Sequence, residues 1–432
     1  MSHGDALAKI RQMDHAADLA RAIHDWQSWF RDVPEPYSLK KIKDTRARDL
    51  VEGGLVVIKT NQSEDGGLMA DSTCYIECYP RDDALGLRGL AAAGHFDEMK
   101  KWLLWIDAKI PLWGHLADSY SGEPSLKYGT LHLDYGDCNV EETAYYLLVA
   151  RDYYKATRDL ATLDRIRPTL TQSMDVQLKD ATTQDSHLDF QGDETEGCAA
   201  GGTVPLDNPA LKEFGDTKTH FWSMGSVAMC AAALDFYIHY LDLHHENPGA
   251  YKNSFTGETM DLHAELKKLL AAMDRDFWRT DVPGLSGGFH DFARRKSNGA
   301  WPAARVVNFT LQPLYFGTPY DPARAKADVQ AMASFFNAKT GFLPLFPPVS
   351  ECFDGHDLGY LLWDLVEIGD SRKGEVYRAL VNGTTADCWG SFTEGYDPNG
   401  QPNDHDLRTL ETGVNVSAIA KYWNLGGYEK AP

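Results

Sequence analysis

Cysteine is scarce in this sequence, and the few residues present are widely scattered. Seven Cys occur among 432 residues, an odd number without the regular spacing of a secreted disulfide framework. Cys74 and Cys78 lie four residues apart, but no second close Cys pair or His pair completes a zinc pattern. We therefore expect reduced, buried thiols, no bound metal and no cofactor.

Basic clusters and long apolar runs are also missing. The 63 Asp and Glu outnumber the 42 Lys and Arg, which gives a net charge of −21. A field of this sign repels phosphate groups and argues against nucleic acids and anionic membranes as partners. The opening residues MSHGDALAKI show no cationic stretch followed by an apolar run, and no apolar run appears long enough to span a bilayer. We expect a cytoplasmic protein that acts on a neutral partner.

Strand-like alternation is rare, whereas helical periodicity dominates. Five apolar stripes have helical spacing: Leu19 to Phe30, Phe96 to Ile106, Val227 to Leu241, Leu262 to Phe277 and Val416 to Trp423. Weaker helical stretches lie at 39–59, 81–94, 141–157, 160–180, 321–338, 356–369 and 374–383.

About twelve helices follow from this pattern, with no low-complexity linker between them. Such a chain can close into a ring of helical hairpins or stack as a solenoid. The long, irregular loops favour the ring, because a solenoid shows more uniform spacing. We predict an all-α (α/α)6 barrel that forms one domain over residues 1–432, with residues 1–35 as a peripheral or first barrel helix.

Several common catalytic motifs do not occur. The sequence has no GxSxG elbow, HExxH pair, Walker loop or GxGxxG turn. Aromatic residues are plentiful instead, with 11 Trp, 20 Tyr and 18 Phe. Many of these belong in a core, but Trp and Tyr at the rim of a site also stack on the apolar faces of sugar rings. Trp113, Trp301, Trp389 and Tyr396 are the candidates for such a role.

Two polar loops precede predicted helices and contain candidate sugar-binding residues. In the first, Tyr79-Pro80-Arg81-Asp82-Asp83, the acids suit the first turn of a helix. Alternatively, Arg81 and Asp82 grip sugar hydroxyls, since a guanidinium donates in a fixed fork and a carboxylate accepts. In the second loop, Asp137 is a candidate sugar contact, with helix N-capping as the alternative.

Two further loops contain acids that are candidates for catalysis. Asp193, Glu194 and Glu196 are crowded between glycines, and crowded carboxylates raise one another's pKa, which suits a general acid. Glu394 lies among aromatic residues on a glycine-flanked loop, whereas Glu411 suits the dipole of the last helix. An acid and a base from these two loops form the pair that glycosidases require.

Three blocks of the sequence, in matching order, resemble the glucoamylase-like glycoside hydrolases of family 15 and their (α/α)6-barrel relatives. They are the segment around YPRDDALGLRGLAAAG, the helix in HFWSMGSVAMCAAALDFYIHYL, and FTEGYDPNGQP. The resemblance covers roughly residues 45 to 425. It implies that Arg81 and Asp82 hold the terminal sugar, that the general acid lies upstream of His220, and that Glu394 is the general base. The family's Trp-Glu element is absent here, so the acid is Glu194, which we favour, or Glu196.

The resemblance implies an inverting, exo-acting hydrolase of an α-glucoside or similar oligosaccharide. Other enzymes on the same barrel are the first alternative: a phosphorylase, an epimerase or a polysaccharide lyase. A non-catalytic sugar-binding barrel is the second. A phosphorylase has a phosphate site in place of the base, so Glu394 argues against it, and turnover separates all the enzymes from the binding protein.

Overall fold

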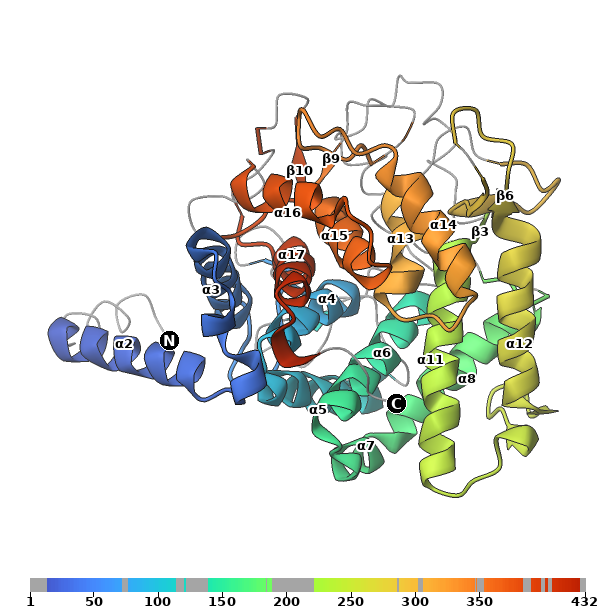
Figure 1. Cartoon of the computed structure of the whole chain (residues 1–432). Helices are drawn as coiled ribbons and strands as arrows, with labels where there is room; N and C mark the ends of the chain where they lie inside the picture. Colours follow the sequence, from blue (N-terminus) through green and yellow to red (C-terminus); the bar gives the residue numbers. More distant parts are fainter. Residues whose placement is uncertain are drawn as a thin grey trace.

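The structure is a computed structural model of the 432-residue chain (Figure 1). It describes residues 14–71, 77–113, 120–121, 139–183, 185–188, 221–285, 287–301, 306–345, 347, 353–383, 390–397, 401–402 and 406–427.

Six helices of the described chain form a closed inner ring. Each contacts the next in the order α4, α6, α11, α13, α15, α17, and α17 packs again on α4. The six helices are α4 (Pro80–Ala92), α6 (Asn139–Thr157), α11 (Met224–Leu243), α13 (Val307–Tyr315), α15 (Asp357–Glu367) and α17 (Thr409–Tyr422). The predicted all-α (α/α)6 barrel is confirmed.

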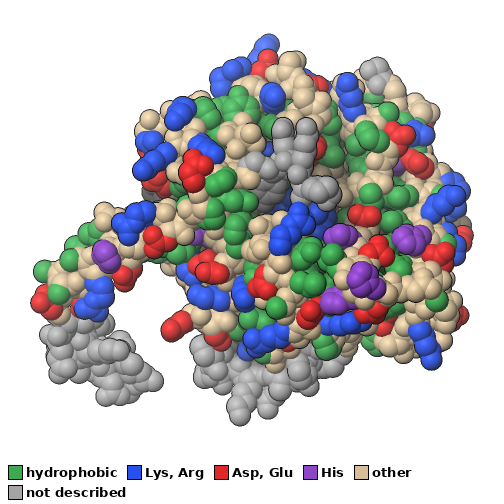
Figure 2. All heavy atoms as spheres, turned by 60° about the horizontal axis from the view of Figure 1, so that its bottom comes forward, with side chains coloured by type: hydrophobic (Ala, Val, Ile, Leu, Met, Phe, Trp, Pro, Cys, Tyr) green, Lys and Arg blue, Asp and Glu red, His purple; other side chains and the backbone are tan. Residues whose placement is uncertain are grey.

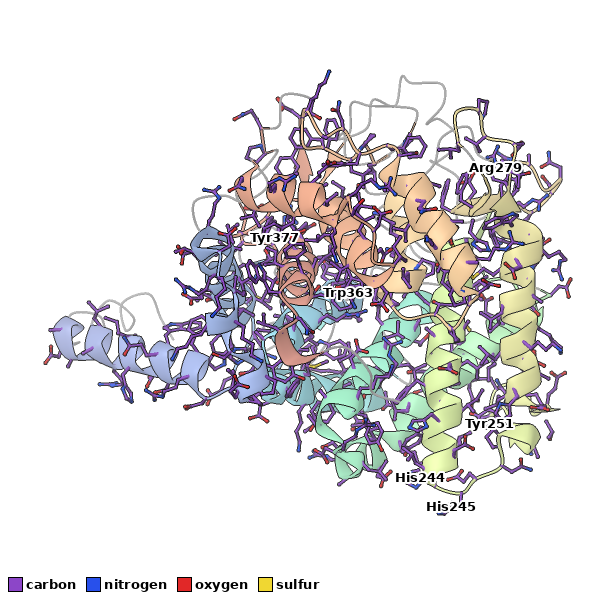
Figure 3. The ribbon with its side chains drawn as sticks, viewed as in Figure 1. His244, His245, Tyr251, Arg279, Trp363 and Tyr377 are labelled. Carbon is purple, nitrogen blue, oxygen red and sulfur yellow. The ribbon has the colours of Figure 1, made fainter. Side chains whose placement is uncertain are left out.

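A second layer of helices alternates with the inner ring along the chain. These outer helices are α3 (Thr45–Thr60), α5 (Phe96–Trp113), α8 (Arg167–Thr183), α12 (Leu262–Ala272), α14 (Pro322–Ala333) and α16 (Lys373–Asn382). Because outer and inner helices alternate as hairpins, the inner helices run in one direction and present all their N-termini at one end. Figure 3 shows Arg279 near that end, Trp363 within the helical layers, and His244 and His245 at the far end of α11.

Two helices lie beside these layers. Helix α2 (His15–Arg31) extends away from the barrel in Figure 1, and α7 (Leu160–Arg165) precedes α8. The anchor of α2 is Trp29, whose ring stacks on His95 at 3.6 Å between centroids and whose Nε1 donates to Glu98 at 3.0 Å. Burial lowers the pKa of His95 to about 4, so the imidazole is neutral in this contact at neutral pH.

Glycine permits the first and last inner helices to approach closely. A Cβ on Gly413 would lie 2.2 Å from the carbonyl oxygen of Leu85, and one on Gly86 would lie 2.3 Å from Thr409 Cγ2. The residue numbers of contacting positions rise together along α4 and α17, which shows that the two helices run parallel. Thr409 also receives a hydrogen bond of 3.0 Å from Asn61 Nδ2, which ties α3 to this seam.

The strands in the described residues are short and form five antiparallel pairs, β1 with β2, β3 with β8, β4 with β5, β6 with β7, and β9 with β10. Their bounds are β1 (Glu77–Cys78), β2 (Tyr120–Ser121), β3 (Phe221–Ser223), β4 (Tyr251–Lys252), β5 (Thr259–Met260), β6 (Trp278–Arg279), β7 (Phe289–His290), β8 (Ala293–Arg295), β9 (Phe353–Asp354) and β10 (Gly395–Tyr396). Strands β1, β3, β9 and β10 border the N-terminal end of the inner ring and therefore shape the loops there.

The helices differ from the sequence pattern at two places. The pattern indicates no helix at 307–315, yet α13 forms there with Pro313 inside it; proline normally ends a helix, and this masks the signal. The stretch predicted at 160–180 is divided into α7 and α8 at Ile166. Pro168 lies in the first turn of α8, where a missing N–H costs least.

The expectation that no apolar run reaches membrane-spanning length is wrong for α11. This helix has 20 residues and a mean hydropathy of 1.2 over its most apolar window, so it passes by length and composition. However, 89% of that window is buried within the protein. The apolar character of α11 is thus explained by its place in the inner ring, where other helices cover most of its surface.

Candidate active site

The N-terminus of α4 presents the arginine and aspartate that were predicted to bind sugar. Tyr79 precedes the helix in an extended conformation, and Pro80 occupies its first position, where its fixed φ favours helix initiation. Arg81 is 9% exposed, and its Nη2 lies 3.2 Å from Asp82 Oδ2. The next acid, Asp83, is fully buried and accepts a hydrogen bond of 2.6 Å from Trp102 Nε1. Asp83 is thus structural, whereas Arg81 and Asp82 remain candidates for ligand binding.

The loop that contains Glu394 is held by the pairing of β9 with β10. Gly395 pairs with Asp354, and the backbone N–H of Gly355 donates to the carbonyl of Glu394 at 2.9 Å. A Cβ on Gly355 would lie 1.7 Å from the carbonyl oxygen of Thr393, so only glycine permits this approach. The Glu394 side chain is 47% exposed and can reach a ligand.

Arg408, the residue before α17, links Glu394 to the barrel. Its Nη2 donates to Glu394 Oε2 at 2.7 Å, and its Nη1 lies 3.3 Å from Asp71 Oδ2. The backbone N–H of Arg408 donates to Ser391 Oγ at 3.1 Å. A buried guanidinium favours the charged form of an adjacent carboxyl group. The ion pair therefore orients Glu394 and favours its ionised form, which is the form that a general base requires.

A second carboxyl group, that of Glu411, lies close to Glu394 but is buried. It is 5% exposed in the first turn of α17. Burial raises its pKa well above the usual value, and Glu394 and Asp354 add to this effect, while Arg408 and His356 oppose it. The site therefore pairs an exposed carboxylate with a carboxyl group that favours its neutral form.

His356 and Asp354 complete the buried part of the site. Nδ1 of His356 lies 2.8 Å from Asp354 Oδ1, and its Nε2 lies 3.1 Å from Asn308 Nδ2 at the start of α13. One potential ligand atom from each of Asp354, His356 and Glu411 lies within 4.8 Å of the others. Metal ligands must be deprotonated, and both ring nitrogens of His356 already have neighbours. The neighbours of both ring nitrogens therefore argue against His356 as a metal ligand in this arrangement.

The geometry brings several predicted site residues to one end of the barrel. Because α4 and α17 are parallel neighbours, Arg81 and Asp82 lie at the same end as Arg408 and Glu394. Four predicted residues, Glu194, Glu196, Asp137 and Trp389, lie outside the described residues, as does the side chain of Trp113.

Two of the aromatic residues predicted to line subsites are already packed. The ring of Trp301 lies beneath two guanidinium groups, with the Cζ of Arg279 at 4.8 Å and that of Arg294 at 4.5 Å from its centroid. Tyr396 is 3% exposed, with its ring 5.9 Å from that of Phe342. Trp301 and Tyr396 therefore do not form open stacking platforms.

Sequence reasoning did not single out Arg408, His356 or Asp354, and it assigned Glu411 to the helix dipole alone. Glu411 does lie in the first turn of α17, where a negative charge is favoured. The structure adds that Glu411 is buried, and the sequence contains a pattern that indicates this burial. The segment TLETGVNVSAIA has no other charged residue. A single acid in an otherwise small and apolar helix is an unusual choice unless that acid has a buried role.

No protein-family model and no curated protein sequence matches this chain. Solved structures do match it. They include a glycosidase variant in complex with glucose, at 13% identity over 88% of this chain and 97% of that chain, with a TM-score of 0.57. A GH63 mannosylglycerate hydrolase from Thermus thermophilus is 14% identical over 85% of this chain and 99% of that chain, with a TM-score of 0.56. A bacterial glucoamylase complexed with acarbose is 9% identical over 98% of this chain and 62% of that chain, with a TM-score of 0.67.

These similarities establish the fold. The GH63 enzymes and the bacterial glucoamylase are (α/α)6-barrel glycosidases, so the chain has the barrel that the resemblance implied. A shared fold leaves the chemistry to be argued from the site itself.

Proposed function

We propose that this protein is a glycoside hydrolase. The observation that carries the proposal is the exposed Glu394 carboxylate, held by Arg408 at 2.7 Å at the end of the barrel where Arg81 and Asp82 lie. A glycosidase needs a carboxylate fixed in direction and open to the substrate. The glycosidases with the same barrel support this reading.

The proposed reaction is inverting and removes a terminal sugar, most simply from an α-glucoside. Glu394 takes a proton from a water molecule, which attacks the anomeric carbon. Glu194, or Glu196 in its place, protonates the leaving oxygen on the other face of the sugar. Arg81 and Asp82 hold the hydroxyls of the terminal sugar, which restricts cleavage to chain ends.

Glu411 affects the charge of the site without contacting the reacting atoms in this scheme. Because burial and its acidic neighbours favour the neutral form, Glu411 adds no second negative charge beside Glu394. The guanidinium of Arg408 is then available to the carboxylate of Glu394 and to Asp71. Arg408 thus orients Glu394, and Glu411 does not compete with Glu394 for this guanidinium.

The test is a screen of aryl glycosides and disaccharides, with and without inorganic phosphate, followed by NMR of the first anomer released. We expect hydrolysis without phosphate and release of the inverted anomer. Glu394→Gln should reduce the rate by at least ~100-fold, the lower range of general acid–base catalysis. One of Glu194→Gln and Glu196→Gln should do the same.

The matched control is Glu246→Gln, which removes an exposed ion pair with Arg167 outside the candidate site and should leave the rate unchanged. Full activity in Glu394→Gln and in both loop variants would overturn the site assignment. Turnover that depends on phosphate would identify a phosphorylase, and sugar binding without any turnover would identify a binding protein.

A further inference from the structure

A cavity lies at the end of the barrel opposite the candidate active site, where the inner helices end. Its volume is about 460 Å³, within the range of small-molecule sites. Five basic side chains line it, Arg88, Arg151, Lys155, Arg158 and Lys421, together with two acids, Asp152 and Glu367. We call this cavity the basic pocket. Figure 2 views the molecule from below and shows Lys and Arg side chains gathered near the middle of this face.

The basic pocket is separate from the candidate active site. Arg88 follows Arg81 by seven residues on α4, and Lys421 follows Glu411 by ten on α17. At about 1.5 Å per residue, these intervals correspond to roughly 10 and 15 Å along the helix axes. A ligand in the basic pocket therefore does not occupy the sugar site.

Three of the five basic side chains have structural partners. Arg88 Nη2 donates to the carbonyl oxygen of Tyr315 at 2.9 Å, and its Nε lies 3.5 Å from Asp152. Arg151 binds Asp152 at 2.8 Å and also donates to the carbonyl of Phe316. Lys421 forms an ion pair with Glu367. These contacts account for both acids of the pocket.

The other two basic side chains, Lys155 and Arg158, form no ion pair with any residue that the structure describes. Lys155 lies in the last turn of α6, where its pKa is lowered, first by the loss of solvent around the amine and then by Arg151. Asp152 and Asp235 act in the opposite direction but lie beyond ion-pair distance. The guanidinium of Arg158 lies 5.6 Å from the ring centroid of Tyr154. Within the described residues, two positive charges at this pocket thus have no carboxylate within ion-pair distance.

Aromatic side chains also line the pocket. Tyr37, Phe96, Phe316 and Trp363 line it, alongside the backbone of Gly317 and Gly426. Aromatic walls favour a ligand with a flat or partly apolar body, and paired cations favour a multiply charged group. The protein as a whole repels anions, with a net charge of −21, so a cluster of positive charge here is a local exception that calls for a specific partner.

We propose that the basic pocket binds a small phosphate monoester of monosaccharide size, with its phosphate between Lys155 and Arg158 and its ring against the aromatic side chains. A phosphate dianion matches the two cations that form no ion pair among the described residues, whereas a neutral sugar matches neither. The site is independent of the glycosidase proposal, because none of its residues takes part in the scheme for hydrolysis.

The experiment is calorimetric titration of the full chain with glucose 6-phosphate, inorganic phosphate and glucose. Glu394→Gln serves as the background, so that turnover of any sugar does not contribute heat. We expect saturable binding of glucose 6-phosphate and weaker binding of inorganic phosphate. Heat from glucose belongs to the sugar site, where Arg81 and Asp82 are retained, and should not change when the basic pocket is altered. Lys155→Met and Arg158→Gln should each weaken the binding of glucose 6-phosphate by at least ~10-fold, a typical loss for one charged hydrogen bond.

The matched controls are Lys155→Arg, which keeps the charge, and Lys268→Met, which removes an exposed lysine on α12. Both should bind like the background protein, and unchanged melting temperatures show that the variants are folded. Absence of glucose 6-phosphate binding overturns the proposal, as does equal binding by all variants. An equal loss of glucose and glucose 6-phosphate binding in Lys155→Met and Arg158→Gln would overturn the assignment of an anionic ligand.

Discussion

The candidate active site and the basic pocket, at opposite ends of the barrel, differ in their charged residues. At the N-terminal end of the inner helices, acids prevail: Asp71, Asp82, Asp354, Asp357, Glu394, Asp406 and Glu411 are grouped with Arg81, Arg408 and His356. At the C-terminal end, five basic residues line a pocket with two acids. The same six helices thus build an acidic site at one end and a basic pocket at the other.

The direction of the inner helices explains this difference. Helix N-termini carry partial positive charge and favour carboxylates, while C-termini favour cations, and six parallel helices place each kind of terminus at one end. The interactions agree with this rule: Arg88 and Arg151 donate to carbonyls at the end of α13, and Asp82 lies in the first turn of α4. The rule leaves Lys155 and Arg158 without described partners, and this excess motivates the ligand proposed for the basic pocket.

The largest effect should come from Asp152, the acid at the centre of the basic pocket. Asp152→Asn removes a buried carboxylate between Arg88 and Arg151, whose guanidinium groups then repel each other. We expect the free energy of unfolding to fall by about 3 kcal/mol or more, measured by urea denaturation. Glu246→Gln is the control, because its partner Arg167 and Glu246 are both 40% exposed and such pairs contribute about 1 kcal/mol at most. Similar losses in both variants would show that Asp152 contributes no more than a surface ion pair.

An intermediate effect is expected for Arg408 at the acidic end. Arg408→Met removes the ion pair that orients Glu394 and leaves Asp71 without this guanidinium. We expect glycosidase activity to fall roughly 10- to 100-fold and the acid limb of the pH–rate profile to move to higher pH, because a carboxyl group without a cation binds its proton more tightly. Arg408→Lys should restore part of the activity. An unchanged pH profile would mean that Arg408 has only a structural role.

The smallest effect is expected for Glu411→Gln. The pKa of Glu411 is raised in the folded protein above the ordinary value of 4.5, so above pH 4.5 the folded state holds a proton that the unfolded chain releases. This difference lowers stability as pH rises. Glutamine removes it, and we expect Tm to increase by roughly 1 to 3 °C at pH 8 and by less at pH 5. The exposed Glu258→Gln is the control, and identical pH dependence in the Glu411→Gln and parent proteins would show that Glu411 is ionised when folded.

Most of the barrel could be predicted from the sequence, because its helices have regular apolar stripes. The stripes from Phe96 and Val227 predict α5 and α11, and the resulting series of helices gives the (α/α)6 class. The exception is α13, where Pro313 interrupts the pattern, although neighbouring helices stabilise the segment as a helix. Tertiary packing determines that this segment is helical, and the local sequence pattern does not predict it.

The candidate site was predictable only where a single segment carries it. Arg81 and Asp82 are adjacent, and Glu394 lies in a distinctive loop, so each could be identified locally. The contact between Arg408 and Asp71 joins residues far apart in the chain, and the burial of Glu411 depends on Gly355 and on the close packing of α4 against α17. Ring closure creates these relations, and they cannot be derived from the spacing of residues in one segment.

The contact between α4 and α17 determines when the barrel can close during synthesis of the chain. Asn61, which follows α3, donates to Thr409, which lies 348 positions later in the chain. The glycines of α4 likewise contact residues of α17, which the ribosome synthesises near the end of translation. At about 5–20 residues per second, that interval lasts tens of seconds. During this interval the ring of inner helices is open, because the surface of α4 that packs against α17 has no partner. We therefore expect chaperone dependence to be greatest just before the final helix emerges.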